Sequence, residues 1–92
     1  MFEAGTRVPF IVNWKGKIKP AIDDEHRLMQ PDIFPTLLDI AGITKKPELH
    51  KDGNSFYPLL LNQGEWQQKP LFFHFPHYTH ATSPGTFLID DN

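Results

Sequence analysis

The feature that most constrains this chain is a short, almost continuous apolar run at residues 8–12 (VPFIV). The run follows a glycine turn and is too short for an ordinary helix, and its β-branched and aromatic residues favour a strand. Strands that lack the usual alternation of apolar and polar residues are typical of a sheet that helices cover on both faces. The run therefore predicts a buried core strand at about residues 7–14.

The chain is short for a sheet of that kind. It has 92 residues, and a chain of this size buries only roughly 60 to 65% of its unfolded surface. Its hydrophobic content of 39% lies below the ~45–50% of an average globular domain. Eight phenylalanines and two tryptophans nevertheless argue against disorder, because large rings are seldom left in water. We expect a compact piece whose buried surfaces need more protein than these residues supply.

Charge and residue usage exclude several classes of protein. The formal net charge is −2, and no basic run is longer than two residues, so the sequence carries no electrostatic signal for nucleic acid or an anionic membrane. The absence of cysteine excludes disulfides, thiolate metal sites and a cysteine nucleophile within this chain. No apolar stretch approaches the ~18 residues that a membrane span needs, and residues 1–5 lack the features of a signal peptide.

The clearest predicted helix covers about residues 32–42. Asp32 is the expected N-cap, Pro35 falls where its missing N–H has no partner within the helix, and Gly42 can end the helix in the left-handed conformation. Apolar residues at three- and four-residue spacing form one stripe, which we expect to pack across the strand at residues 8–12. The stripe comprises Ile33, Phe34, Leu37, Leu38 and Ala41.

The second half of the sequence predicts shorter elements. A polar linker at residues 45–54 ends in an Asp-Gly turn, and a short helix is expected at about residues 55–61. An aromatic strand at residues 71–75 is closed by Pro76, which cannot donate to a strand ladder. A polar loop and a last strand at residues 86–89 complete the pattern.

Catalytic residue types are concentrated in one place, at residues 74–80 (HFPHYTH). His74, His77 and Tyr78 are the candidate substrate-binding residues, because imidazole and phenol groups can hydrogen-bond an anionic substrate. The spacing of the histidines resembles a metal array, but the proline in the run argues against a helix that would bring the ligands to one face. Histidines that are merely packed or solvated beside aromatic residues remain the structural alternative.

Two further groups of charged residues have simpler explanations. Asp23, Asp24 and His26 offer metal-ligating side chains, but three close ligands without a periodicity are typical of a solvated loop or short helix. Glu3 and Arg7 flank the glycine turn, and an arginine that enters a buried strand usually needs a carboxylate. The pair is therefore expected to be a structural ion pair, with direct substrate contact as the alternative.

Four blocks of the sequence resemble one family. Residues 3–12 and 14–18 (EAGTRVPFIV, WKGKI) resemble the EGGxRVPFIVxWPGKI stretch of the type I sulfatases, the arylsulfatase-like branch of the alkaline phosphatase superfamily. Residues 32–42 (DIFPTLLDIAG) are similar to the family's DLFPTLLDLAG helix, and residues 52–60 (DGNSFYPLL) to its DGxSLxPLL segment. Residues 74–78 (HFPHY) resemble the strand and loop that open its small C-terminal subdomain.

This resemblance implies an α/β fold of the alkaline phosphatase and sulfatase type, of which the chain is a fragment. Residues 1–65 would be the end of the α/β domain, and residues 66–92 the start of an antiparallel C-terminal subdomain. Family members hydrolyse sulfate esters or sulfamates, with calcium and a formylglycine made from cysteine or serine. The nucleophile motif C/S-x-P-x-R is absent here, and the resemblance places the metal ligands and a catalytic lysine before Met1. We therefore expect no catalytic residue, metal ligand or cofactor in this chain, and no activity by itself.

The resemblance also bears on substrate, partners and location. The substrate of the whole enzyme is expected to be a sulfated sugar or an aryl sulfate, and the expected partner is the missing N-terminal part of the sulfatase or a second copy of the chain. Export to the periplasm or outside the cell rests on resemblance alone. The alternatives are a binding or assembly module without catalysis, and a piece of a related phosphate or phosphonate ester hydrolase.

Overall fold

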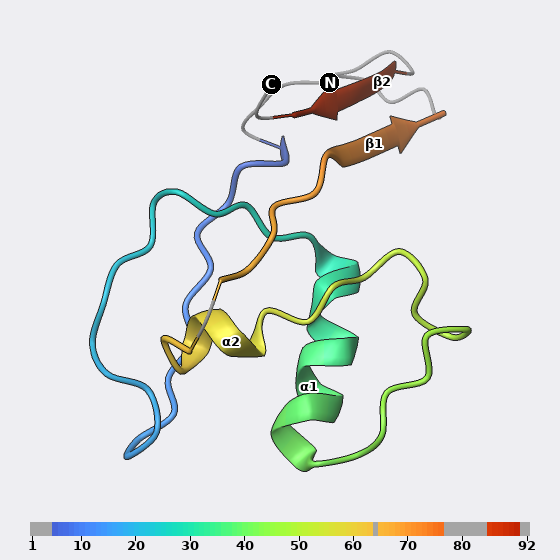
Figure 1. Cartoon of the computed structure of the whole chain (residues 1–92). Coiled ribbons are helices and arrows are strands. Elements are labelled where there is room, and N and C mark those ends of the chain that lie inside the picture. Colours follow the sequence, from blue (N-terminus) through green and yellow to red (C-terminus); the bar gives the residue numbers. More distant parts are fainter. Residues whose placement is uncertain (1–4, 64, 77–84, 91–92) are drawn as a thin grey trace. The chain divides into compact units, whose positions relative to one another are not determined.

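The structure, a computed structural model, describes residues 5–63, 65–76 and 85–90. The elements are a 3-10 turn η2 (Gln30–Asp32), helices α1 (Ile33–Ala41) and α2 (Tyr57–Leu60), and strands β1 (Leu71–Phe75) and β2 (Gly85–Ile89) (Figure 1). The chain forms two compact units, one of residues 14–68 and one of residues 1–13 with 69–92. Across the described ranges, no helix has the length and apolarity that crossing a membrane requires.

Helix α1 confirms the prediction at residues 32–42. Pro35 lies in its first turn, and the helix ends at Gly42, whose φ of 70° is left-handed. The N–H of Gly42 donates to the carbonyl of Asp39 at 3.1 Å, and that of Ile43 donates to the carbonyl of Leu38 at 2.9 Å. These two bonds satisfy carbonyls at the end of the helix that have no partner within it.

Helix α2 confirms the short helix expected at about residues 55–61, although it is a single turn. Phe56 stands at its N-cap, with Pro58 in the first turn. The chain leaves the turn through Asn62, whose φ of 52° is unusual for a residue with a side chain. In Figure 1 the segment before α2 runs alongside α1.

The strands β1 and β2 confirm the expected antiparallel pair. Their register joins Leu71 to Ile89 and Phe73 to Phe87. Phe73 and Phe87 stack with ring centroids 4.8 Å apart, which is the kind of cross-strand contact that stabilises a two-stranded sheet. Because side chains alternate along a strand, Phe72 and His74 lie on the other face of the sheet, and both are exposed.

The prediction of a buried strand at residues 7–14 is wrong for this chain. Residues 7–14 form no strand, and their apolar side chains face water, with Val8 68% and Ile11 87% exposed. A strand needs neighbouring strands to satisfy its backbone groups. The sheet in the described part of the chain consists of β1 and β2 alone.

The predicted packing face of α1 is also wrong. Phe34 and Leu37, at the centre of the apolar stripe, are 50% and 54% exposed. The buried residues of the helix are Pro35 and Thr36, together with Asp32 just before it. The helix therefore turns its polar side toward the segment before α2 and its apolar side away from it. The expected domain boundary near residue 65 stays a prediction.

Gly53 allows that segment to approach the start of α1 closely. A Cβ atom at this position would overlap the carbonyl oxygen of Pro31 and lie 3.3 Å from Cγ of Pro35. Pro35 is fully buried, so it has little room to move. The missing side chain of Gly53 is therefore what lets the Asp-Gly turn lie against the turn η2.

We predict that Gly53→Ala lowers the free energy of unfolding by about 1–3 kcal/mol, the usual cost of overpacking. The control is Gly85→Ala, where an added Cβ meets nothing within 4 Å and φ is not positive. That control should be neutral or slightly stabilising, because alanine restricts the unfolded chain. Chemical denaturation of both variants measures the difference, and equal effects would contradict the close approach.

Candidate functional site

His74 is the one predicted substrate-binding residue within the described residues. It lies on β1, on the exposed face of the two-stranded sheet, directly opposite Thr86 on β2. Its Nδ1 lies 2.7 Å from Oγ1 of Thr86, a hydrogen bond that fixes the orientation of the ring. Because the contact uses Nδ1 only, Nε2 is the ring nitrogen that points away from it and can meet a ligand.

The other predicted site residues cannot be assembled around His74. His77, Tyr78 and Glu3 lie outside the described residues, so the proposed loop and the Glu3–Arg7 ion pair stay predictions. Arg7 itself is exposed. The face that carries His74 also bears the cross-strand pair of Phe72 and Leu88, both exposed. An imidazole, a hydroxyl and two apolar side chains thus share one surface.

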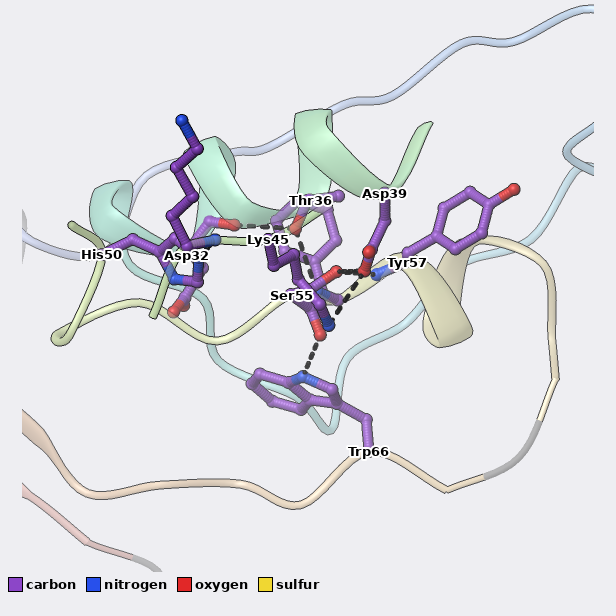
Figure 2. Close-up of polar contacts among 10 residues, drawn as sticks. Asp32, Thr36, Asp39, Lys45, His50, Ser55, Tyr57 and Trp66 are labelled. Atoms are coloured by element: carbon purple, nitrogen blue, oxygen red, sulfur yellow. Dashed lines mark hydrogen bonds and ion pairs between the residues drawn. The ribbon is translucent and has the colours of Figure 1, made fainter. Parts of the chain in front are cut away.

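A second group of polar residues lies in the unit of residues 14–68, and the sequence analysis did not single it out. We name it the polar clasp, and its members come from α1, from the residue before it and from the segment around α2 (Figure 2). The polar clasp consists of Asp32, Thr36, Asp39, Ser55 and Trp66. The first three recur at four- and three-residue spacing, which puts them on one side of a helix.

Asp32 anchors the N-terminal end of the polar clasp. Its carboxylate is 5% exposed and accepts two backbone N–H bonds, from Met29 at 2.8 Å and from Asn54 at 2.7 Å. Burying a carboxylate is costly unless donors compensate it, and these two N–H groups do so without a cation. The side chain therefore ties residue 54 to the start of α1, instead of capping the helix as the sequence predicted.

Thr36 occupies the centre of the polar clasp and is 2% exposed. Its hydroxyl donates to the carbonyl of Asp32 at 2.7 Å and accepts from the N–H of Phe56 at 2.9 Å. A hydroxyl can do both at once because it carries one donor and two acceptor lone pairs. One side chain thus connects the first turn of α1 to the start of α2.

Asp39 and Trp66 complete the polar clasp on either side of Ser55. The Ser55 hydroxyl donates to Oδ2 of Asp39 at 2.5 Å, and Nζ of Lys45 lies 3.5 Å from the same oxygen. The indole N–H of Trp66 donates to the Ser55 carbonyl at 2.9 Å (Figure 2). All these contacts are internal, so the polar clasp supports the fold.

The charged loop at residues 23–27 is ordered by Asp23. Its carboxylate accepts the backbone N–H groups of Glu25 and His26 at 3.0 Å each and contacts Nδ1 of His26 at 2.8 Å. The bond from the His26 N–H is the main cause that holds the pKa of Asp23 below its ordinary value of 3.8, while partial burial acts in the opposite direction. The loop is therefore an Asx turn with a paired histidine.

The same loop is attached to the segment at residues 66–68. The His26 ring meets the Trp66 ring edge-on, with centroids 5.7 Å apart. The Gln68 side-chain amide pairs with the backbone of Arg27, accepting its N–H at 2.8 Å and donating to its carbonyl at 3.1 Å. Asp24 takes no part in these contacts, and the described residues contain no group of three side chains placed to hold a metal ion.

Comparison with known proteins places the chain among the sulfatases. Residues 1–86 match the family described as N-sulphoglucosamine sulphohydrolase, C-terminal, and the chain belongs to that family. It is 37% identical to arylsulfatase A of Homo sapiens over 96% of this chain and 17% of that protein. It is 34% identical to the steryl-sulfatase of Rattus norvegicus over 80% of this chain and 13% of that protein.

The chain is also similar to a sulfatase that is named for its action on ulvan. The ulvan-active sulfatase of Formosa agariphila is 43% identical over 63% of this chain and 11% of that protein. No solved structure matches the chain. The chain thus spans between 11 and 17% of the length of these three relatives. The resemblance to the sulfatases is confirmed.

We predict that Thr36→Val lowers the free energy of unfolding by about 1–3 kcal/mol, because the Phe56 N–H loses a buried acceptor. Valine has nearly the same shape, so packing changes little. Thr36→Ser is the matched control, since it keeps the hydroxyl and loses only a methyl group. Urea denaturation compares the two, and equal losses would show that the methyl group matters more than the hydroxyl.

We also predict a specific loss of stability in acid. The folded-state pKa of Asp23 is depressed, so its contribution is fully present above the unfolded pKa and is lost as the pH falls through the folded value. Below about pH 4 the wild type should therefore lose more stability than Asp23→Asn, which has no carboxylate to protonate. Asp24→Asn is the neighbouring control and should follow the wild type in unfolding experiments from pH 7 to pH 3.

Proposed function

We propose that this chain is the part of a sulfuric ester hydrolase that supports the fold and contributes one edge of the substrate site, and that it has no catalysis of its own. The match of residues 1–86 to the C-terminal family of a sulphohydrolase carries the proposal. The buried polar groups of the polar clasp form hydrogen bonds within the chain, and the sequence contains no C/S-x-P-x-R motif. Nucleophile and metal site then belong to other parts of the enzyme.

The described residues do not suit a calcium site. They contain no group of three side chains placed to hold a metal ion, both oxygens of Asp32 accept backbone N–H bonds, and Oδ2 of Asp39 accepts a bond from a hydroxyl and lies near a lysine. Calcium needs six to eight oxygen ligands around one point. The calcium and the formylglycine that the family resemblance implies are therefore assigned to the remainder of the enzyme.

His74 is the residue that we propose for contact with a sulfated substrate, together with His77 and Tyr78. The exposed position of His74 and its hydrogen bond to Thr86 support this role, because a ring of fixed orientation can offer Nε2 to a sulfate oxygen. Phe72 and Leu88 beside it suit the apolar face of an aryl group or a sugar ring. We propose an aryl sulfate or a sulfated sugar as the substrate class.

A second candidate function is an assembly module without catalysis. Exposed apolar residues at positions 8–12 and on α1 favour it, because large exposed apolar surface commonly marks an interaction site. If the chain is part of an enzyme, its partner is the remainder of the sulfatase. If it is an assembly module, its partner is a second copy of the chain. For the enzyme we also propose export to the periplasm or outside the cell, on the basis of the family resemblance.

The experiment measures hydrolysis of 4-nitrophenyl sulfate with added calcium in two proteins. One is the chain alone, and the other is a chimera in which this chain replaces the 89 matched residues of human arylsulfatase A. We expect no turnover by the chain and measurable turnover by the chimera. A chimera with Leu37→Lys shows how damaged folding affects turnover, and a blank with buffer alone gives the background rate. In a chimera that turns over, His74→Gln should raise KM more than it lowers kcat, because it removes a binding contact.

Turnover by the chain alone would overturn the claim that the nucleophile lies elsewhere. A soluble, folded chimera without turnover would contradict the placement of this chain within a working sulfatase. An unchanged KM in His74→Gln would remove His74 from the site and leave the rest of the proposal standing.

A further inference from the structure

The loop after α1 is organised around one imidazole ring, and we name residues 45–52 the His50 loop. The backbone N–H of Lys46 donates to Nε2 of His50 at 3.1 Å, and the His50 carbonyl accepts the N–H of Gly53, also at 3.1 Å. The ring meets the ring of Phe34 edge-on in the first turn of α1, with centroids 6.0 Å apart. His50 therefore connects the start of the loop to its end and to the helix.

The bond from Lys46 determines where the ring of His50 carries its proton. A backbone N–H can only donate, so Nε2 has to accept and carries no hydrogen. A neutral imidazole has one N–H, which then lies on Nδ1. A protonated imidazole has an N–H on both nitrogens and no acceptor left. The closed form of the His50 loop thus requires a neutral ring.

His26 responds to a proton in the opposite way. Its Nδ1 lies 2.8 Å from Oδ2 of Asp23. An ionised carboxylate only accepts, so this bond persists when the ring gains a proton, and the contact becomes an ion pair. The two histidines differ in their partners, because a carboxylate suits a protonated ring and a backbone N–H does not. A proton that breaks the contact of His50 therefore strengthens that of His26.

The charges near His50 add to the effect of a proton. The His50 loop contains three lysines and two carboxylates, so repulsion adds to the loss of the acceptor once the ring is charged. Phe34, the side chain of α1 that meets the ring, carries no charge. The carboxylates of Asp32 and Asp39 are engaged in the polar clasp. The charged residues of the loop are Lys45, Lys46, Glu48, Lys51 and Asp52.

We propose that His50 is a pH-sensitive latch on the loop that leads from α1 toward α2. The neutral ring closes the His50 loop by accepting the Lys46 N–H, and protonation in mild acid removes the acceptor and opens the loop. Imidazole is the side chain that ordinarily gains a proton between about pH 8 and pH 5. The open loop can take up this proton and the closed loop cannot, so a fall in pH favours opening. The latch is independent of the proposed function, because these contacts lie within residues 34–53.

Limited proteolysis of the 92-residue chain measures how often the loop opens. Thermolysin cuts before large apolar residues, and Leu49 in the His50 loop is such a residue, 68% exposed. Ile22, which is 95% exposed, gives a reference cut in the same molecule. Mass spectrometry reads the ratio of the cut before Leu49 to the cut before Ile22 at pH 8 and at pH 5. The ratio cancels the pH dependence of the protease itself.

In the wild type the ratio should rise at least about tenfold from pH 8 to pH 5, the change that one linked proton supports over one pH unit. His50→Gln is the matched control, because its amide oxygen accepts the Lys46 N–H and does not titrate. Its ratio should stay low at both pH values. His50→Phe keeps a ring against Phe34 without an acceptor, so its ratio should be high at both.

An unchanged ratio in the wild type would overturn the latch. An equal rise in His50→Gln would also overturn it, because another group would then cause the pH dependence, and a low ratio in His50→Phe would show that the ring closes the loop without its acceptor. Should a variant fail to fold, the wild type still decides. A long-range proton–nitrogen NMR spectrum at pH 8 should show the proton of the His50 ring on Nδ1, and a proton on Nε2 would contradict the proposal.

Discussion

The hydroxyl of Thr36 is the contact on which the unit of residues 14–68 depends. It bonds to the carbonyl of Asp32 within the first turn of α1 and to the N–H of Phe56, twenty residues further along the chain. The flanking bonds of Asp32 to Asn54 and of Asp39 to Ser55 keep the two segments aligned, so that this buried hydroxyl meets its partner. Such a group stabilises the fold only while both of its bonds are made.

This arrangement reverses the usual orientation of an amphipathic helix. Three polar positions on one side of α1 hold the segment around α2 by hydrogen bonds, and the apolar side is left outward. Hydrogen bonds are directional and fix one geometry, whereas apolar burial is proportional to area and tolerates several. The polar clasp thus fixes the position of α1 by directional bonds, and the apolar side of the helix is left exposed as a result.

Much of the local structure could be predicted from the sequence, because it depends on neighbouring residues. Gly42 ends α1 and Pro76 follows β1 for backbone reasons that require no tertiary contact. The strand at residues 7–14 was predicted wrongly, because a run of apolar residues indicates the need for neighbouring strands but does not provide them. The orientation of α1 was missed because helical periodicity shows which residues share a face of the helix, but not what covers that face. The spacing of Asp32, Thr36 and Asp39 was the available signal for the polar clasp.

The motifs that resemble the sulfatases include four of the five residues of the polar clasp. The blocks at residues 32–42 and 52–60 contain Asp32, Thr36, Asp39 and Ser55, and the structure uses all four in internal contacts. In these two blocks the resemblance thus reflects residues that maintain the fold, and it identifies the family without identifying the substrate. Under the proposed function, choice among sulfate esters would depend on side chains that face outward, such as His74, which is exposed and oriented by Thr86.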